Sequence, residues 1–445
     1  MRASALKYLI LTWVGGFVLV IFLLMPFHAF LTVWLSSWLG HYTALRLWVE
    51  VLLVLSVLGV LFLLATDHKI RSHTLPRRLT QLILLYVLIN LIWGAVAWHH
   101  HAVTAKALGY GLIVNLRFPI FFLVCWSVSL RTKRIHNPWR VALIVPSIIV
   151  VTIGLLQMFV LPYDFLKHFG YSTSTIFPYE TINHNVHYIR VMSTLRGANP
   201  LGAYLLLPIS YLTVLIARGH RQWQNVLLWV ASLLTLYFSF SRSAWIGAVV
   251  AMALIVWLSL RSAKLRQQAL LVAAAGLVIV AGIGFGLRHH PALQNIVQHT
   301  QSHSAVKQTS NAGHWQALKT GIHDIVHEPL GRGPGTAGPA SLYNDKHHAR
   351  IAENYFIQVG QETGWIGLLV FMLINAGVGY LLWCRRADPL ALALFVSLIG
   401  LSLVNCLSHA WTDDTLSYVW WGLAGIAMVS TEPTGAAKPA KTKKT

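Results

Sequence analysis

Long apolar stretches separated by short polar segments run through most of the chain. The clearest of them cover residues 8–25, 47–65, 79–98 and 141–160. Each comes close to the roughly 20 residues with which an α-helix crosses the hydrocarbon core of a bilayer. Membrane β-barrels instead show alternation over strands of about 10 residues. Because lipid leaves no backbone group unpaired, only helices or closed barrels can span it. The pattern therefore predicts an all-α integral membrane protein.

About twelve transmembrane helices are expected, two of which are separated by a polar Ser-Arg-Ser sequence near residue 241. The expected spans cover residues 6–26, 44–65, 79–98, 112–130, 141–161, 199–217, 225–240, 243–260, 268–287, 355–382, 388–409 and 415–430. An even number of spans places both termini on one side. We expect residues 1–430 to form a single polytopic domain with long outer loops at about 162–198 and 288–354, and residues 431–445 to form a disordered basic tail.

Composition and charge agree with this class and predict the orientation. Hydrophobic residues make up 56% of the chain and charged residues 11%, whereas soluble domains carry about a quarter charged residues. Lys and Arg gather in the segments 69–78, 131–140 and 261–266, as they do in short cytoplasmic loops. Both termini are therefore expected in the cytoplasm. The net charge of +21 is dispersed over these loops, which argues against nucleic-acid binding and fits contact with anionic lipid.

Arginine is prominent in the segments expected at the outer face. The outer arginines are Arg190, Arg196, Arg242, Arg288, Arg332 and Arg350. A guanidinium offers planar, bidentate donors that suit phosphate and stays charged at any relevant pH. Arg242 stands out because it lies deep between two apolar stretches, where a charge is costly unless it is paired or faces a polar cavity. It predicts an anion site, although an arginine that snorkels from a helix end would give the same pattern. The excess of arginine favours an anionic substrate such as a diphosphate.

Two further arginines lie inside expected spans. Arg46 and Glu50 are one helical turn apart, which predicts a structural pair on one helix. Arg117 has no evident matching carboxylate, so both a structural and a functional role are open for it.

Two local patterns in the long outer loop leave alternatives open. Gly331-Arg332-Gly333-Pro334-Gly335 could cradle a phosphate through its N–H groups or could form ordinary turns, and it lacks the spacing of a P-loop. Residues 314–326 have apolar positions at helical spacing. This helix could lie on the membrane surface or pack within the loop.

Histidines and aromatic residues supply further candidate contacts. His347 and His348 are possible proton carriers near neutral pH. Adjacent histidines without spaced acidic or cysteine partners make a weak metal signal, so no metal is expected. Trp315, Tyr343 and Tyr355 could stack on sugar rings, although aromatic residues more often serve packing. The three cysteines are far apart and indicate neither a disulfide framework nor a redox pair.

Four sequence patches resemble the O-antigen ligase/polymerase superfamily of bacterial membrane glycan transferases. The patches are Arg196-Gly197-Ala198-Asn199-Pro200-Leu201-Gly202, Ser239-Phe240-Ser241-Arg242-Ser243-Ala244-Trp245, Glu328-Pro329-Leu330-Gly331-Arg332-Gly333, and Glu353-Asn354 followed after nine residues by Gly364-Trp365-Ile366-Gly367. They lie within about 190–250 and 315–370, in the order and on the face that the family uses. The last is similar to a family signature that begins with His.

The resemblance implies a GT-C-like fold in the bacterial inner membrane. It also implies transfer of a glycan from an undecaprenyl diphosphate donor to an acceptor hydroxyl at the outer face, without cofactor, metal or nucleotide sugar. Outer arginines would hold the diphosphate. Carried over to this chain, Arg242, Arg196, Arg190 and Arg288 are the expected diphosphate ligands. Arg332, Arg350, His347, His348 and Trp315 are expected as further acceptor or phosphate contacts.

Position 353 departs from the family, because Glu353 stands where the family has His. A carboxylate can act as general base, so Glu353, with Asn354 beside it, is the expected catalytic pair. Alternatively, His347 or His348 takes this part, or Glu353 only pairs with an arginine such as Arg350. The departure favours a polymerase of lipid-linked repeat units over a ligase that transfers glycan to lipid A core. The competing hypothesis is a transporter or flippase of lipid-linked glycans, although no internal repeat supports it.

Overall fold

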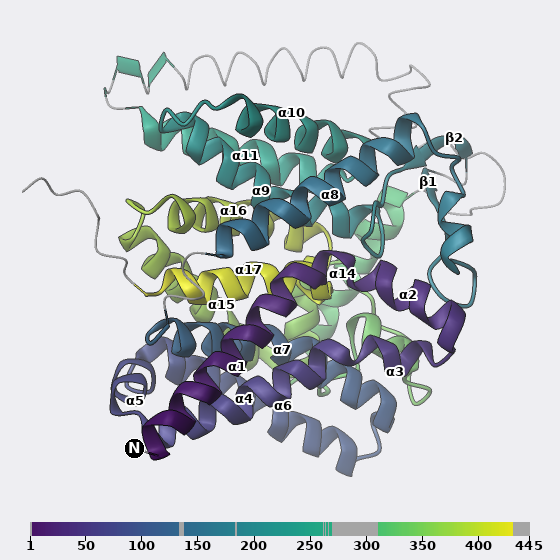
Figure 1. Ribbon diagram of the computed structural model, residues 1–445. Helices are drawn as coiled ribbons and strands as arrows, with labels where there is room; N and C mark the ends of the chain where they lie inside the picture. Colours follow the sequence, from purple (N-terminus) through teal and green to yellow (C-terminus); the bar gives the residue numbers. More distant parts are fainter. Residues whose placement is uncertain are drawn as a thin grey trace, which may run out of the picture.

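Helices account for nearly all of the described chain. The computed structural model describes residues 2–132, 138–182, 185–260, 262, 264–265, 267–268 and 310–429. In the described part, one two-stranded antiparallel sheet is the only extended structure. Figure 1 shows a bundle in which most long helices run in broadly the same direction.

The elements before residue 200 form one half of the bundle and the sheet. The helices are α1 (Arg2–Leu24), the 3-10 helix η1 (Met25–Phe27), α2 (His28–Leu39), α3 (Tyr42–Arg46), α4 (Trp48–Thr66), α5 (His68–Thr74), α6 (Arg78–His99), α7 (Ala105–Ser129), α8 (Trp139–Phe159) and the 3-10 helix η2 (Phe165–Phe169). The strands are β1 (Glu180–Ile182) and β2 (Asn185–Arg190), which pair Glu180 with Arg190.

The remaining elements complete the bundle. They are α9 (Ala198–Ala217), α10 (Trp223–Phe238), α11 (Arg242–Ser259), α14 (Ser310–His327), the 3-10 helix η4 (Gly338–Tyr343), α15 (Tyr355–Cys384), α16 (Pro389–Leu407), the 3-10 helix η5 (Ala410–Thr412) and α17 (Asp414–Ala427).

The described residues contain nine candidate membrane spans rather than twelve. These nine match nine of the expected spans. The expected spans 225–240 and 415–430 correspond to α10, which has 16 residues, and α17, which has 14. At about 1.5 Å per residue, both helices fall short of the roughly 30 Å hydrocarbon core. The expected span 268–287 lies almost entirely outside the described residues.

The shortness of α17 is compatible with its position at the centre of the molecule (Figure 1). Trp420 and Trp421 are fully buried, and Phe118 of α7 packs against Trp421 with ring centroids 5.0 Å apart. A helix enclosed by other helices is apolar on all sides without having to meet lipid. Hydropathy alone does not separate such a helix from a short span.

Peripheral helices show the opposite distribution of apolar surface. Val51, Val54 and Leu58 of α4 are each more than half exposed. In a membrane protein, an apolar face of this kind is the face that meets lipid.

The two ends of the bundle differ in character. One end carries basic residues, among them Arg131, which pairs with Asp67 at 2.7 Å, and Arg218, which donates to the Ala387 carbonyl at 2.7 Å. The opposite end, called the sheet end, carries β1 and β2 and lies far from the N-terminus (Figure 1). The predicted orientation places the end with Arg131 and Arg218 in the cytoplasm and the sheet end on the outer side.

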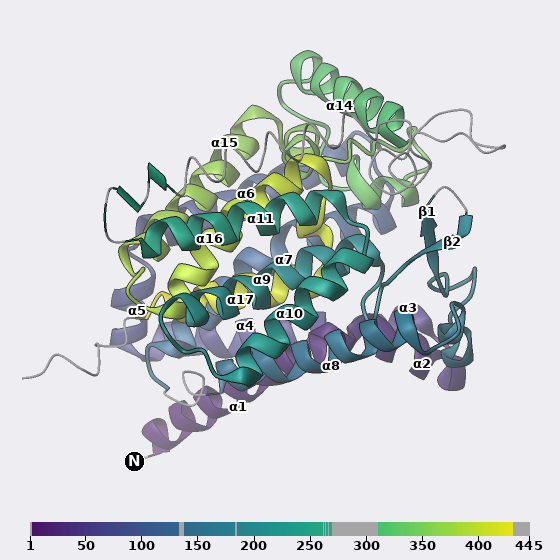
Figure 2. The same ribbon diagram turned by 90° about the horizontal axis from the view of Figure 1, so that it is seen from above.

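The predicted helix at residues 314–326 is confirmed as α14, which packs on α15 (Figure 2). Ile325, and partly Leu318, contact the hydrophobic cluster that Ala352 and Ile357 form. Trp315 and Val326 remain exposed on another face. The helix packs against α15, as one of the two alternatives expects, and contact of its exposed face with a membrane surface stays a prediction.

Candidate active site

Arg190 is fixed at the sheet end by three groups from different elements. Its Nη1 lies 3.4 Å from the Glu180 carboxylate across the sheet, its Nε donates to the Ser239 carbonyl at 3.0 Å, and its Nη2 donates to Asn199 Oδ1 at 2.6 Å. These contacts connect β2 to the end of α10 and the first turn of α9.

Arg196 lies just before α9 and faces the segment that leads into α17. Its Nη2 is 3.9 Å from Asp413, and 32% of its side chain is exposed against 4% for Asp413. Asp413 is also the N-cap of α17, where its Oδ1 accepts from Leu416 N at 3.0 Å. The carboxylate therefore serves both a helix end and an arginine.

Arg242 is the first residue of α11 and is half-buried. The sharp turn before it is built by Phe240, which has a left-handed backbone with φ 49°. Arg190 is close enough to act on Arg242 electrostatically. The structure thus brings Arg190, Arg196 and Arg242 to one end of neighbouring helices, whereas Arg288 lies outside the described residues.

A cavity of about 240 Å³, here called the arginine cavity, opens between these elements. Its lining includes Glu180, Arg196, Gly197, Asn199, Pro200, Ser243, Ser408, His409, Thr412 and Asp413. Gly197 is the N-cap of α9 and Ser243 lies in the first turn of α11, so two helix N-termini meet here. Helix N-termini carry partial positive charge and unpaired N–H groups, which attract anions. At the N-terminus of α9, the Glu180 carboxylate is the anion, and it accepts a hydrogen bond from Ala198 N at 3.3 Å.

Glu353 lies beside this cavity and contacts a residue that sequence reasoning missed. Its carboxylate bonds to His314 Nδ1 of α14. The hydrogen bond from His314, with further electrostatic contributions from His314 and His409, holds the pKa of Glu353 below its ordinary value, against burial, which raises it. Glu353 is therefore ionised at neutral pH. No sequence pattern links position 314 to position 353, and neither His347 nor His348 is the histidine at this carboxylate.

His409 is a second histidine that the sequence did not single out. It lines the arginine cavity between α16 and α17. Burial lowers the pKa of His409, so the imidazole is neutral near pH 7 and able to accept a proton. Its position just past an apolar span, on the same face as the outer arginines, is the only signal in the sequence.

Asn354 is engaged by backbone groups on both sides of its amide. Its Oδ1 accepts from Ile357 N at 3.0 Å as the N-cap of α15, and its Nδ2 donates to the Cys406 carbonyl at 2.9 Å. In addition, Tyr355 N donates to the Ser408 carbonyl at 3.2 Å. These contacts hold Glu353 next to the 408–409 segment of the arginine cavity.

Arg332 and Arg350 form a separate ionic cluster with acidic residues. Arg350 Nη2 lies 2.8 Å from Glu328 and its Nε lies 3.3 Å from Asp324, while Arg332 pairs with Glu328. The two arginines hold the pKa of Glu328 below its ordinary value despite its partial burial. Arg350 therefore pairs with Asp324 and Glu328, which corrects the alternative that it pairs with Glu353.

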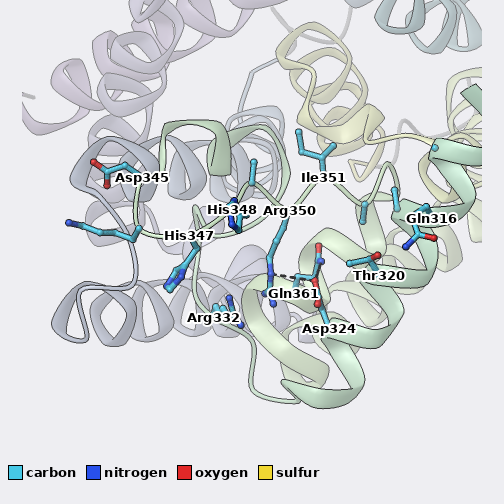
Figure 3. Close-up of a pocket in the computed structure, with 16 residues that line it drawn as sticks. Gln316, Thr320, Asp324, Arg332, Asp345, His347, His348, Arg350, Ile351 and Gln361 are labelled. Carbon is cyan, nitrogen blue, oxygen red and sulfur yellow. Dashed lines mark hydrogen bonds and ion pairs between the residues drawn. The ribbon is translucent and has the colours of Figure 1, made fainter. Parts of the chain in front are cut away.

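A second cavity, here called the α14 cavity, lies between α14 and the loop 345–352 (Figure 3). Arg332, Arg350, His347 and His348 all contribute to its lining. Trp315 lies on α14 with 59% exposure, and Lys319 Nζ stands 5.3 Å from its ring centroid. Of the predicted substrate contacts, Arg332, Arg350, His347 and His348 therefore line the α14 cavity, whereas Arg196 lines the arginine cavity.

Tyr355, one of the aromatic residues considered for sugar stacking, is fully buried and packs edge-on against Phe371. It has no surface for a sugar, which corrects that interpretation.

The glycine-rich loop uses its N–H groups within the protein. Arg332 N and Gly333 N donate to the Gln361 and Glu362 carbonyls at 3.0 and 2.7 Å, and Gly335 N donates to Glu362 Oε1 at 2.8 Å. A phosphate would find these donors occupied. The loop is therefore a packed turn, which corrects the phosphate-cradle alternative.

The intramembrane arginines have partners different from those predicted. Arg46 lies 3.6 Å from Asp414, and Arg117 lies 4.0 Å from Glu50. The predicted Arg46–Glu50 pair is wrong, because α3 ends at Arg46 and Glu50 belongs to the next helix, α4. The same Asp414 carboxylate lies 3.4 Å from His28 Nε2.

Comparison with known families places part of this site in a recognised domain. Residues 226–372 match the family model described as O-Antigen ligase. The matched segment contains Arg242, Arg332, Arg350 and Glu353 together with α14 and the start of α15. Arg190 and Arg196 precede it. No curated protein matches the chain.

Proposed function

We propose, from the match of residues 226–372 to the O-antigen ligase family model, that this multi-pass membrane protein is a glycosyltransferase. It transfers a glycan from an undecaprenyl-diphosphate-linked donor to a sugar hydroxyl at the outer face of the cytoplasmic membrane. The observation that carries the proposal is the convergence of Arg190, Arg196 and Arg242 beside one cavity with Glu353 at its edge.

The donor diphosphate occupies the arginine cavity in this proposal. Two helix N-termini and three guanidinium groups supply positive potential there. Arg190 and Arg196 are already paired with Glu180 and Asp413. When the diphosphate binds, it displaces these carboxylates as the partner of the two arginines. Negative charge grows on the diphosphate as it leaves, and preorganised donors stabilise the transition state more than the ground state.

Glu353 acts as the general base. It takes the proton of the acceptor hydroxyl as the acceptor oxygen attacks the anomeric carbon, and the bond between that carbon and the diphosphate oxygen breaks. The electron pair leaves with the diphosphate. Because the acceptor oxygen attacks from the face opposite the diphosphate, the anomeric centre is inverted. His314 holds the carboxylate by its hydrogen bond. Asn354 positions the backbone next to Glu353, because the Asn354 amide is hydrogen-bonded to α15 and to the Cys406 carbonyl.

We further propose that the acceptor is the end of another lipid-linked chain, which makes the protein a polymerase rather than a ligase to lipid A core. The support for this is the departure of position 353 from the histidine of the family signature.

The deciding experiment incubates the purified protein in detergent with a polyprenyl-diphosphate oligosaccharide and reads the products by mass spectrometry. We expect longer lipid-linked products with wild type and a loss of about 10²–10⁴-fold with Glu353→Gln, the range typical of a missing general base. Transfer only after addition of lipid A core would identify a ligase. Lipid-linked glycan that crosses liposomes without covalent product would identify a transporter and refute the proposal.

A further inference from the structure

The α14 cavity is large, polar and next to the proposed base. Its volume is about 760 Å³, within the roughly 300–1,000 Å³ typical of ligand sites. Figure 3 shows side chains of α14 and of the loop 345–352 directed into it from two sides. Gly313 and Ala352, which line it, directly precede His314 and Glu353. The α14 cavity is therefore lined by the residues next to both members of the His314–Glu353 contact.

Two buried polar atoms at this cavity have no hydrogen-bond partner within the described part of the chain. They are Gln361 Oε1 and Arg350 Nη1. Gln361 is 2% exposed, and its Nε2 is already committed to Asp324 Oδ2 at 2.7 Å. A buried donor or acceptor without a partner is costly. A ligand that reaches either atom after a small movement of the side chain therefore gains a hydrogen bond that the protein itself does not supply.

The charges at the cavity distinguish between ligand classes. Arg350 and Arg332 are neutralised by Asp324 and Glu328, and the other two charged residues of the lining, Lys346 and Asp345, have opposite charges. A phosphate would also face the lone pairs of Gln361 Oε1 and the Asp324 carboxylate, which repel it. A sugar hydroxyl both donates and accepts, so vicinal hydroxyls satisfy an amide oxygen and a guanidinium nitrogen together.

We propose that the α14 cavity is a binding site for a neutral, polyhydroxylated glycan segment. Gln361 and Arg350 form its floor, and Gln316 and Thr320 of α14 form its wall. The glycan segment comes either from the acceptor or from the donor, and the assignment to one of them rests on the proposed function. The existence of the site does not, because it rests on the cavity and its two unpartnered atoms.

The test fills the cavity from α14 and uses the same helix as its control. Thr320→Trp places an indole into the cavity, whereas Ile322→Trp places it on a side chain that is 50% exposed and outside the lining. Gln316→Trp is a second filling variant in case Thr320→Trp does not fold. Folding is checked by size exclusion in detergent.

Binding is measured first, without any transfer. The probe is a neutral oligosaccharide cut from the lipid-linked donor and freed of phosphate, and native mass spectrometry reads its dissociation constant. We expect the filling variants to bind at least tenfold more weakly than wild type, while Ile322→Trp and the arginine-cavity variant Arg196→Ala bind as wild type does. Equal binding by filled and control variants, or none by wild type, overturns the inference.

Kinetics then identify the source of the glycan. A tenfold rise of KM for the acceptor alone in Thr320→Trp assigns the cavity to the acceptor, and a rise for the donor alone assigns it to the donor glycan. Binding of the probe without transfer in wild type would refute the proposed function and leave the glycan site standing. Transfer with unchanged KM values in the filled variants would refute the glycan site alone.

Discussion

Glu353 combines a rare backbone conformation with a directed hydrogen bond. Its φ of 52° lies in the left-handed region, which few residues other than glycine adopt and which is often kept where function requires it. Asn354 on one side and His314 on the other fix the carboxylate in this position. At the scale of the residue, the candidate base is held both by the adjacent N-cap of α15 and by His314 of a different helix.

Replacing His314 with Ala should move the acid limb of the pH–activity profile to higher pH. The hydrogen bond from His314 lowers the pKa of Glu353, so the wild-type base stays ionised until the pH falls through this lowered pKa. Without the bond the carboxyl protonates at higher pH, and activity is lost sooner on acidification. The measurement is transfer rate against pH between 3 and 8.

The control for this prediction is His314→Gln, which keeps a hydrogen-bond donor and should shift the limb less. An acid limb that is identical in wild type and His314→Ala would contradict the prediction.

Arg242→Ala should reduce transfer by roughly 10²–10³-fold, as the loss of one preorganised donor to a developing anion does. Arg242→Lys should recover only part of the rate, because an ammonium lacks the bidentate geometry of a guanidinium. Product formation at equal protein level is the measurement. The matched control is Arg221→Ala, an exposed arginine in the loop between α9 and α10, and equal losses in Arg242→Ala and Arg221→Ala would count against a role in the site.

At the scale of elements, the signature after Glu353 serves packing. Gly364 has φ 67° and kinks α15, and a Cβ there would lie 2.3 Å from the Pro329 carbonyl oxygen. The kink lets the 329–335 loop pass against α15, where the buried Glu362 binds Gly335 N. Because glycine has no side chain, α15 and the 329–335 loop approach one another more closely here than any other residue would permit.

Gly364→Ala should destabilise the protein by about 2 kcal/mol or more, from the left-handed backbone and the contact with Pro329 together. Gly16→Ala is the control, since a Cβ at Gly16 meets nothing within 4 Å. Thermal unfolding in detergent, followed by fluorescence size exclusion, compares the two. A Gly364→Ala midpoint equal to that of Gly16→Ala would contradict the packing argument.

At the scale of the whole molecule, ion pairs and a hydrogen bond connect α17, the last described helix, to η1, α2 and α3 near the start of the chain. Asp414 at the start of α17 lies near Arg46 and His28, and Thr415 Oγ1 donates to the Met25 carbonyl at 2.9 Å. These contacts join segments almost 400 residues apart in the chain. They also place the central α17 against the sheet end, next to Asp413 and Arg196.

Asp414→Asn should destabilise the protein by about 3–5 kcal/mol, because removal of one partner leaves buried positive charge uncompensated. Asp67→Asn removes the partner of Arg131, whose side chain is 39% exposed, and should cost only about 0–1 kcal/mol. Chemical denaturation in detergent gives both values. Equal effects of the two substitutions would refute the ion pairs of Asp414 as a stabilising feature.

The sequence by itself determined the class of the protein and predicted which arginines gather at one end of the bundle. Hydropathy is local, so runs such as 79–98 predict a span wherever their neighbours pack. Arg190, Arg196, Arg242 and Arg288 were predicted as diphosphate ligands from the family resemblance, and Arg242 also because a guanidinium between two apolar stretches is costly unless it meets an anion or a polar cavity. The length of α17 was not predicted, since burial by protein and burial by lipid select the same side chains.

Only the tertiary structure decided which charges meet. Glu50 pairs with Arg117 rather than Arg46, and Glu353 meets His314 rather than His347 or His348. Such pairs depend on how helices pack and where the backbone bends, as at Phe240, Glu353 and Gly364. Helical periodicity reaches only a few residues along the chain, whereas these contacts join positions tens to hundreds of residues apart.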